Sequence, residues 1–250
     1  MTAKYSIGVE KYTDGEYAHY SPSWHREDSI WKVKQIGKLL DKTQLESLFP
    51  NARTLKVIDI GCGAGGVLGN FTHYLSTLNC QVDATGIEPS PGALEIARKD
   101  WPDLQLKQLN LLDVQEHFDI GLMIDVVEHV ENPWQFVREA ASRCSLLIFH
   151  IPLDDSLLTE LASLYHYKAQ TMGHIHFFTR QKALWFLDSC GLNVLGHRFT
   201  QSFNVPSSLE ISSKHKLLAL PRRVLASVSP SACSRLLGGM SLMVVAQVKK

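Results

Sequence analysis

The sequence contains no CxxC pair, no long apolar run and no excess of either charge. Its five cysteines form an odd, scattered set, and the opening residues MTAKYSIGVEKY lack the apolar core of a signal peptide. No apolar run approaches the length that spans a membrane, and internal repeats are absent. Lys and Arg number 25, as do Asp and Glu, so the basic excess typical of nucleic-acid binding is missing. We therefore expect a cytoplasmic protein that does not bind nucleic acid.

The composition is typical of a chain that forms one α/β domain. Of 250 residues, 45% are hydrophobic and 20% are charged, which is enough to bury an extensive core. Strand and helix patterns alternate over residues 54–198, which predicts a mostly parallel sheet with helices on both faces. We expect a single domain over 1–250, with a helical N-terminal cap (1–50), a core (51–200), an insertion (201–239) and a last strand (240–250).

The segment KVIDIGCGAGG, residues 56–66, places glycines where a buried strand passes into a helix. Val57, Ile58 and Ile60 suit a strand buried on both faces, and apolar residues then recur at helical spacing. Glycines let a ligand lie against the backbone, and the start of the next helix offers free N–H groups to an anion. The corner contains Gly61, Cys62, Gly63 and Gly65.

Asp59 stands two positions ahead of the first glycine and separates two interpretations of this corner. Gly61, Gly63 and Gly66 also satisfy the dinucleotide pattern GxGxxG, which is weak on its own. A carboxylate beside the loop repels a pyrophosphate, but it complements the ammonium and sulfonium charges of S-adenosylmethionine. Asp59 thus favours that cofactor over a nicotinamide dinucleotide. A purely structural acid that holds the loop is the simpler alternative.

A second acid, Glu88, follows the next predicted strand, Val82–Ile87. A carboxylate at a strand end can accept hydrogen bonds from both hydroxyls of a ribose. Ser90 suits the N-cap of a helix with Pro91 at its first position, which supports a strand end at Glu88. We interpret Glu88 as the ribose ligand. The alternative is an ordinary exposed acid before a helix.

Three strings, VIDIGCGAGG, GIEPSPGALEIAR and FDIGLMIDVVEHVENP, resemble successive cofactor motifs of class I S-adenosylmethionine-dependent methyltransferases. The resemblance implies a Rossmann-like, doubly wound, seven-stranded sheet, mostly parallel with an antiparallel C-terminal strand. It also implies that S-adenosylhomocysteine is the product. Asn110 departs from the family, because many relatives have an acid there, but its amide oxygen can still accept a hydrogen bond from adenine. The implied cofactor contacts are Asp59, Gly61, Cys62, Gly63, Gly65, Glu88, Pro89, Asn110, Leu111 and Asp125.

Four of the eleven histidines lie near predicted strand ends. Methyl transfer requires an acceptor held in line at about 3 to 3.5 Å and, for a hydroxyl, removal of its proton, which histidine suits near neutral pH. The family topology brings the carboxyl ends of the strands to one sheet edge. We expect catalysis by His129 with His174 or His176, whereas His150 can instead pack within its strand. A structural role is the alternative for each of them.

Asp125, Glu128 and His129 form a DxxEH set. It resembles the ExxEH metal site of ubiquinone-pathway O-methyltransferases and of small-RNA 2′-O-methyltransferases, although Asp replaces the first Glu. Carboxylates and imidazole can bind a divalent metal, which would acidify an acceptor hydroxyl. We adopt the simpler interpretation that this segment lines the methionine pocket and that no residue serves as a metal ligand.

The segments outside the core carry weaker signals. Tyr12, Tyr17, Tyr20 and Trp24 precede an amphipathic stretch and suggest a lid over the cofactor, while the stretch itself is expected to pack on the sheet. In the insertion, basic residues surround leucines, which fits a membrane surface or an anionic substrate. We favour a solvated amphipathic face there, because Pro221 is expected to interrupt the helix.

The strings FHIPLD, GHIHFFT and LLGGMSLMVVA resemble stand-alone methyltransferases encoded with bacterial surface-polysaccharide genes. This resemblance implies O-methylation of a small molecule or saccharide. Two alternatives remain open. One is an NAD(P)-dependent oxidoreductase, which the glycine pattern permits, and the other is a catalytically silent methyltransferase fold that only binds a partner.

Overall fold

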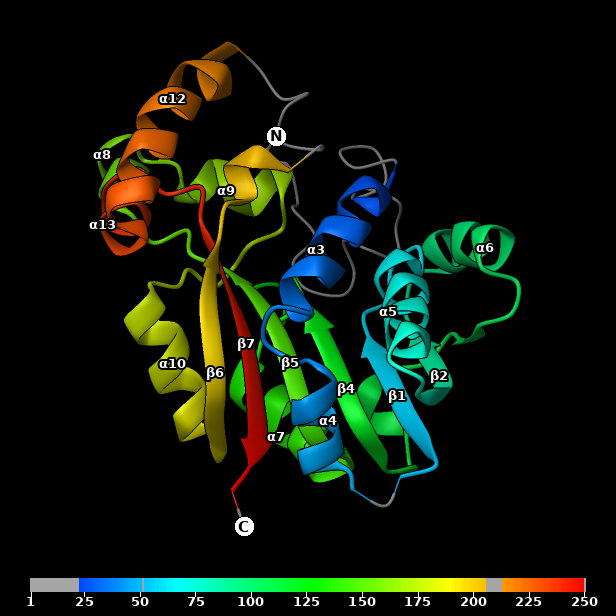
Figure 1. Cartoon of the computed structure of the whole chain (residues 1–250). Coiled ribbons are helices and arrows are strands. Elements are labelled where there is room, and N and C mark those ends of the chain that lie inside the picture. Colours follow the sequence, from blue (N-terminus) through cyan, green and yellow to red (C-terminus); the bar gives the residue numbers. More distant parts are fainter. Residues whose placement is uncertain (1–22, 51, 206–212, 250) are drawn as a thin grey trace.

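A seven-stranded sheet lies at the centre of the computed structural model, which describes residues 23–50, 52–205 and 213–249 (Figure 1). The expected lid residues Tyr12, Tyr17 and Tyr20 lie outside the described residues. The strands are β1 (Thr54–Ile60), β2 (Gln81–Ile87), β3 (Gln105–Lys107), β4 (Phe118–Ile124), β5 (Cys144–Pro152), β6 (Leu192–Thr200) and β7 (Ser241–Val248).

Helices and single helical turns connect these strands. The N-terminal and cofactor-side elements are η1 (Arg26–Asp28), α3 (Ser29–Ile36), α4 (Lys42–Leu48), α5 (Gly66–Thr77), α6 (Pro91–Asp100) and η2 (Leu111–Asp113). The later ones are α7 (Pro133–Arg143), α8 (Leu157–Leu161), α9 (Tyr165–Thr171), α10 (Arg180–Ser189), η3 (Ser202–Asn204), α12 (Ser213–Val228) and α13 (Pro230–Leu236).

The strand order is β3-β2-β1-β4-β5-β7-β6. The pairs among β1 to β5 are parallel, and β7 lies antiparallel between β5 and β6. The predicted sheet, mostly parallel with an antiparallel C-terminal strand, is confirmed. Because parallel strands share a direction, the carboxyl ends of β1, β2, β4 and β5 meet at one edge, where ligands of such sheets bind.

Helices cover both faces of the sheet because its central strands are apolar on both sides. Val57 belongs to the core shared with α3, α4 and α5. Its neighbours Ile58 and Ile60 point the other way, into the core shared with α7 and α10. The predicted two-sided burial of this strand is therefore confirmed.

Two of the predicted helix starts are confirmed by their caps. The Ser90 hydroxyl accepts from the Ala93 N–H of α6 at 3.4 Å. The Thr179 hydroxyl accepts from the Lys182 N–H of α10 at 3.1 Å. Each cap satisfies a backbone donor that the first turn of a helix leaves without a partner. These caps define where the loops at the functional edge end.

The prediction that Pro221 interrupts the helix of the insertion is wrong, because α12 runs through it. A proline removes one backbone donor, but tertiary contacts hold the helix directly after Pro221. The Arg222 guanidinium donates to the Leu237 carbonyl at 2.8 Å, and the Cys233 thiol lies 3.6 Å from the Arg222 carbonyl. Among the described residues, no helix is both long enough and apolar enough to cross a membrane.

Candidate active site

The glycine corner between β1 and α5 is tied to the end of β2. The N–H groups of Gly61 and Cys62 both donate to the Ile87 carbonyl, at 2.9 and 3.0 Å. Gly61, Gly63 and Gly65 have φ values of 74°, 52° and 75°, a region that residues with a Cβ rarely adopt. Among the described residues, a Cβ atom at Gly63 would have one neighbour within 4 Å, the Trp24 ring at 4.0 Å. The loop therefore leaves room for a ligand against its backbone.

Glu88 is buried directly after β2 and faces the same loop. Its carboxylate accepts from the Gly63 N–H at 3.0 Å and from the Ser90 N–H at 2.9 Å. Burial raises the pKa of Glu88, and the two N–H groups oppose that shift. Each carboxylate oxygen keeps a second lone pair, which suits a pair of ribose hydroxyls. The neighbouring Pro89 carbonyl accepts from the Gln108 amide at 3.2 Å.

Asp59 is a buried carboxylate near the carboxyl end of β1. Burial and the nearby Glu88 carboxylate raise the pKa of Asp59 to about 7, although Lys32 and the Leu68 N–H favour its ionised form. A buried carboxylate of this kind is stabilised by a cationic ligand. S-adenosylmethionine fits this chemistry, because it brings an ammonium and a sulfonium to the acid and ribose hydroxyls to Glu88.

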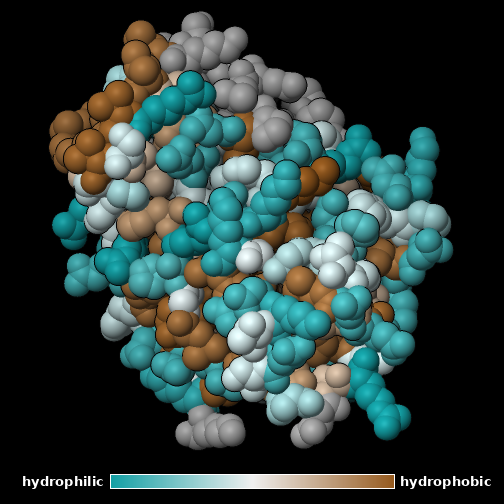
Figure 2. Space-filling view, in the orientation of Figure 1, coloured by the Kyte–Doolittle hydropathy of each residue, from teal (hydrophilic) through white to brown (hydrophobic). Residues whose placement is uncertain are grey.

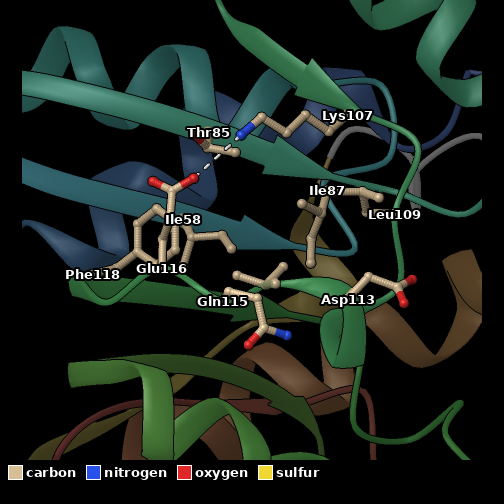
Figure 3. A pocket seen from close by; sticks show the side chains of 10 residues that line it. Ile58, Thr85, Ile87, Lys107, Leu109, Asp113, Gln115, Glu116 and Phe118 are labelled. Carbon is tan, nitrogen blue, oxygen red and sulfur yellow. Dashed lines mark ion pairs between the residues drawn. The ribbon is translucent and has the colours of Figure 1, made fainter.

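Asn110 and Leu111 lie where β3 leads into η2. Asn110 is exposed, and its N–H donates to the Asp113 carboxylate at 3.3 Å, whereas Leu111 is buried. A separate cavity of about 180 Å³ has Asp113 and Glu116 among its lining residues (Figure 3). Neither Asp59 nor Glu88 lines it, so it is distinct from the glycine corner.

Asp125 connects the N-terminal helix to the middle of the sheet. Its φ is 56°, and its N–H donates to the His150 carbonyl at 2.9 Å. One carboxylate oxygen accepts from His150 Nδ1 at 2.6 Å, and the other is 2.8 Å from the Lys32 ammonium. Although burial would raise the pKa of Asp125, His150 and Lys32 hold it well below its usual range. Asp125 is therefore ionised and paired within the protein.

His150 lies within β5 and is buried. Its Nε2 is 2.9 Å from the Thr200 hydroxyl, and its ring packs edge-on against Trp31 at 6.0 Å between centroids. This is the packed position that the sequence left open for His150. Lys32 and Thr200 were not predicted to belong to this network, because no local pattern marks either residue.

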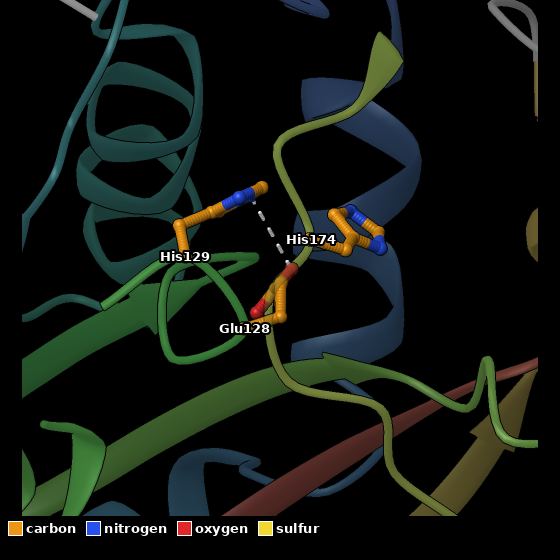
Figure 4. A group of neighbouring side chains, drawn as sticks. All are labelled: Glu128, His129 and His174. Atoms are coloured by element: carbon orange, nitrogen blue, oxygen red, sulfur yellow. Dashed lines mark ion pairs between the residues drawn. The ribbon is translucent and has the colours of Figure 1, made fainter. Parts of the chain in front are cut away.

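Two loops, one after β4 and one before α10, bring three side chains together (Figure 4). They are Glu128, His129 and His174. One potential ligand atom from each residue lies within 4.8 Å of the other two, and the two imidazole rings meet edge-on with 4.9 Å between their centroids. Asp125 is not part of this group. The predicted DxxEH set is thus divided between two networks, one around Lys32 and one around His174.

His174 is oriented by a carboxylate that sequence analysis missed. Its Nδ1 donates to Asp154 at 2.7 Å, and the other oxygen of Asp154 is 2.5 Å from the Lys168 ammonium. Although burial opposes ionisation, Lys168 and His174 hold the pKa of Asp154 well below its usual range. The available signal was the position of Asp154 just past the end of β5, where site residues of parallel sheets gather.

Burial shifts the pKa values of His129 and Glu128 in the direction that favours the neutral form of each. Burial and the neighbouring His174 lower the pKa of His129 to about 3. Burial and Asp125 raise the pKa of Glu128 well above its usual value. His129 donates from Nδ1 to the Gly173 carbonyl at 3.0 Å, so its Nε2 is the acceptor of the ring.

His176, the third predicted catalytic histidine, has a different environment. Its Nε2 donates to the Val130 carbonyl at 2.9 Å, and its backbone N–H donates to the Glu128 carbonyl at 3.1 Å. It is not part of the group formed by Glu128, His129 and His174. These contacts join the loop before α10 to the loop after β4, and they thereby support the two clustered histidines.

Known proteins match this chain in both sequence and fold. Residues 31–197 match the methyltransferase domain family. The chain is 31% identical over 93 residues to the ubiquinone biosynthesis O-methyltransferase of Azorhizobium caulinodans, covering 34% of each protein. It is 36% identical over 100 residues to that of Rhodopseudomonas palustris, covering 38% of this chain and 36% of the relative. The matched segment thus spans about a third of the length of these relatives.

Solved methyltransferases share the fold at low sequence identity. Magnesium protoporphyrin IX methyltransferase from Synechocystis has a TM-score of 0.54 and 14% identity, with 93% of this chain and 96% of that chain covered. A putative methyltransferase from Haloferax volcanii has a TM-score of 0.60 and 14% identity, with 97% and 98% covered. At such identities these structures establish the fold alone. Since the family match takes in the glycine corner, Glu88 and the histidine loops, the chain belongs to the methyltransferase domain family, as a class I S-adenosylmethionine-dependent methyltransferase.

Proposed function

We propose that this enzyme methylates a hydroxyl group of a small molecule or saccharide. The observation that carries the proposal is the pairing of His174 with Asp154 at 2.7 Å. Because Nδ1 of His174 donates to this carboxylate, its Nε2 is the ring atom that accepts a proton. The relatives named as O-methyltransferases in ubiquinone biosynthesis support the same type of acceptor atom.

The proton of the acceptor hydroxyl passes to His174 Nε2 in this proposal. Asp154 holds the ring in the required tautomer and stabilises the imidazolium that forms, as a carboxylate does behind a catalytic histidine. His129 is a poor base, because burial lowers its pKa to about 3, so its role in the proposal is to position the His174 ring by edge-on packing at 4.9 Å between ring centroids. His176 acts through the loop that it anchors at Val130.

The cofactor half of the site follows from the acids and the glycine corner. S-adenosylmethionine supplies the methyl group from its sulfonium. Glu88 binds the ribose hydroxyls, Asp59 compensates the positive charge, and the N–H groups at the start of α5 face the carboxylate of the methionine part. The adenine contacts of Asn110 and Leu111 and the contact of Asp125 with the methionine part stay predictions.

Other acceptors and other activities have less support. An amine needs only to be kept neutral, so the ordered pair of His174 and Asp154 favours a hydroxyl. The carboxylate of Asp59 beside the glycine corner disfavours the pyrophosphate of a nicotinamide dinucleotide. A cytoplasmic location is part of the proposal, because all five cysteines are free thiols and thiols persist in a reducing compartment.

Incubation with a labelled methyl donor and fractionated cell metabolites tests the proposal. We expect a labelled O-methyl product, identified by mass spectrometry, that disappears with the His174→Ala variant. A labelled N-methyl product would contradict the hydroxyl assignment. Tight binding of S-adenosylhomocysteine in calorimetry without turnover of any fraction would instead favour the catalytically silent alternative.

A further inference from the structure

The α12 helix exposes an apolar stripe. Leu217, Leu220, Val224 and Val228 are 78%, 68%, 59% and 81% exposed. Their spacing of three, four and four residues places them on one side of the helix. Figure 2 shows hydrophobic side chains gathered at the upper left of the molecule, where Figure 1 places α12 and α13. We call these four residues the α12 stripe.

A different side of α12 packs against the protein. Arg222 and Ala226 are buried there, and the Arg222 guanidinium donates to the Leu237 carbonyl at the end of α13. Ala226 and Cys233 belong to one small apolar cluster. Packing inside the protein therefore accounts for this side of the helix and leaves the α12 stripe facing outward.

The segment that carries the stripe is strongly basic. Between Ser213 and Leu236 the sequence has five Lys or Arg residues and no Asp or Glu, whereas the whole chain is neutral. The five are Lys214, Lys216, Arg222, Arg223 and Arg235. The side chains of Arg223 and Arg235 are exposed.

We propose that α12 docks on the surface of an anionic lipid bilayer. An interfacial helix places its apolar side at the boundary of the acyl chains and its cationic residues among the headgroups. A second copy of the chain is a poorer occupant, because it would bring the same basic segment against this one. Directly after the insertion, the Met240 carbonyl accepts from the N–H of Leu153 at 2.9 Å, and Leu153 is one residue before Asp154. Docking would thus bring the acceptor half of the site towards the bilayer.

Vesicle co-sedimentation of the full chain tests this inference without any methyl acceptor. We expect binding to vesicles that contain phosphatidylglycerol and little binding to phosphatidylcholine vesicles, with the difference suppressed at high salt. Arg223→Gln with Arg235→Gln should weaken binding about 30-fold, because each basic residue at such a surface contributes about 1 kcal/mol. Leu217→Ser with Leu220→Ser should weaken it at least about tenfold through lost apolar burial.

Leu195→Ser is the matched control, since Leu195 is an exposed apolar residue of β6 outside the basic segment; it should leave vesicle binding unchanged. Circular dichroism and S-adenosylhomocysteine binding check that each variant is folded. Equal binding to both vesicle types, or binding to neither, would overturn the inference. So would a concentration-dependent dimer that the stripe variants abolish while no vesicle binding is observed.

Discussion

The two acids beside the glycine corner have raised pKa values, whereas Asp125 and Asp154, just after β4 and β5, are paired with cations. Asp59 and Glu88 have raised pKa values, and the contacts of Glu88 are backbone N–H groups. Asp125 and Asp154 have lowered pKa values, because Lys32 and Lys168 lie against them together with His150 and His174. A bound cation would therefore stabilise the ionised forms of Asp59 and Glu88. Asp125 and Asp154 are already ionised, and they orient the side chains that contact them.

Removal of the His174 side chain should have the largest effect, and it should lower catalysis without weakening cofactor binding. We expect His174→Ala to lower kcat about a thousandfold, within the range typical of general acid–base groups. Its affinity for S-adenosylhomocysteine should not change, because His174 belongs to the histidine cluster and not to the glycine corner. Steady-state kinetics and calorimetry measure the two effects. His73→Ala, on the exposed side of α5, is the control, and an equal loss of kcat there would contradict the assignment.

Glu88→Gln should instead weaken binding of the cofactor. The amide places an N–H₂ group against the N–H of Gly63 or Ser90, and it removes a charged acceptor for the ribose. Hydrogen bonds to charged groups contribute about 1.5–3 kcal/mol, so affinity for S-adenosylhomocysteine should fall roughly 10- to 150-fold in calorimetry. Glu95→Gln, an exposed acid of α6, should bind normally. Unchanged affinity of Glu88→Gln would remove Glu88 from the cofactor site.

The raised pKa of Asp59 predicts that cofactor affinity depends on pH. The carboxyl is protonated below its pKa of about 7 and ionised above it, and only the ionised form attracts a cation. Affinity for S-adenosylmethionine should therefore rise with pH, by up to about tenfold per unit below the pKa, and level off above it. Calorimetry across this range measures the effect. In Asp59→Asn the profile should be flat, and a flat profile in the unsubstituted enzyme would sink the interpretation.

Chelation should have the smallest effect. Burial raises the pKa of Glu128 well above its usual value, which disfavours the ionised form that binds a cation, and Asp125 is already engaged by Lys32 and His150. We expect methyl transfer to continue unchanged in EDTA once an acceptor is known. Loss of activity in EDTA, with recovery on addition of Mg²⁺, would show instead that Glu128, His129 and His174 bind a divalent metal.

Local patterns predicted the glycine corner and the start of α6 because the structure of each depends on neighbouring residues. The turn of β1 into α5 needs glycines at positive φ, and the Ser90 cap needs only the first turn of α6. The continuation of α12 through Pro221 was mispredicted for the opposite reason: its stability depends on contacts with α13, which no local propensity describes.

The acceptor half was predicted only in outline. His129 and His174 were recognised as candidates from their positions near strand ends, but Asp154 and Lys32 were not. Lys32 comes from α3, in a stretch that looked like plain packing, and it reaches Asp125 only because α3 lies over the functional edge of the sheet. A side-chain ion pair between distant segments leaves no spacing pattern in the sequence.

The sequence by itself determined the order of strands and helices, the glycine corner and the acids beside it, because buried periodicity, caps and glycine conformations are local properties. Only the tertiary structure decided which histidine gains a carboxylate partner, which acid of the DxxEH set pairs with Lys32, and which side of α12 faces outward. Those outcomes depend on the distance between side chains from separate segments, and packing alone sets that distance.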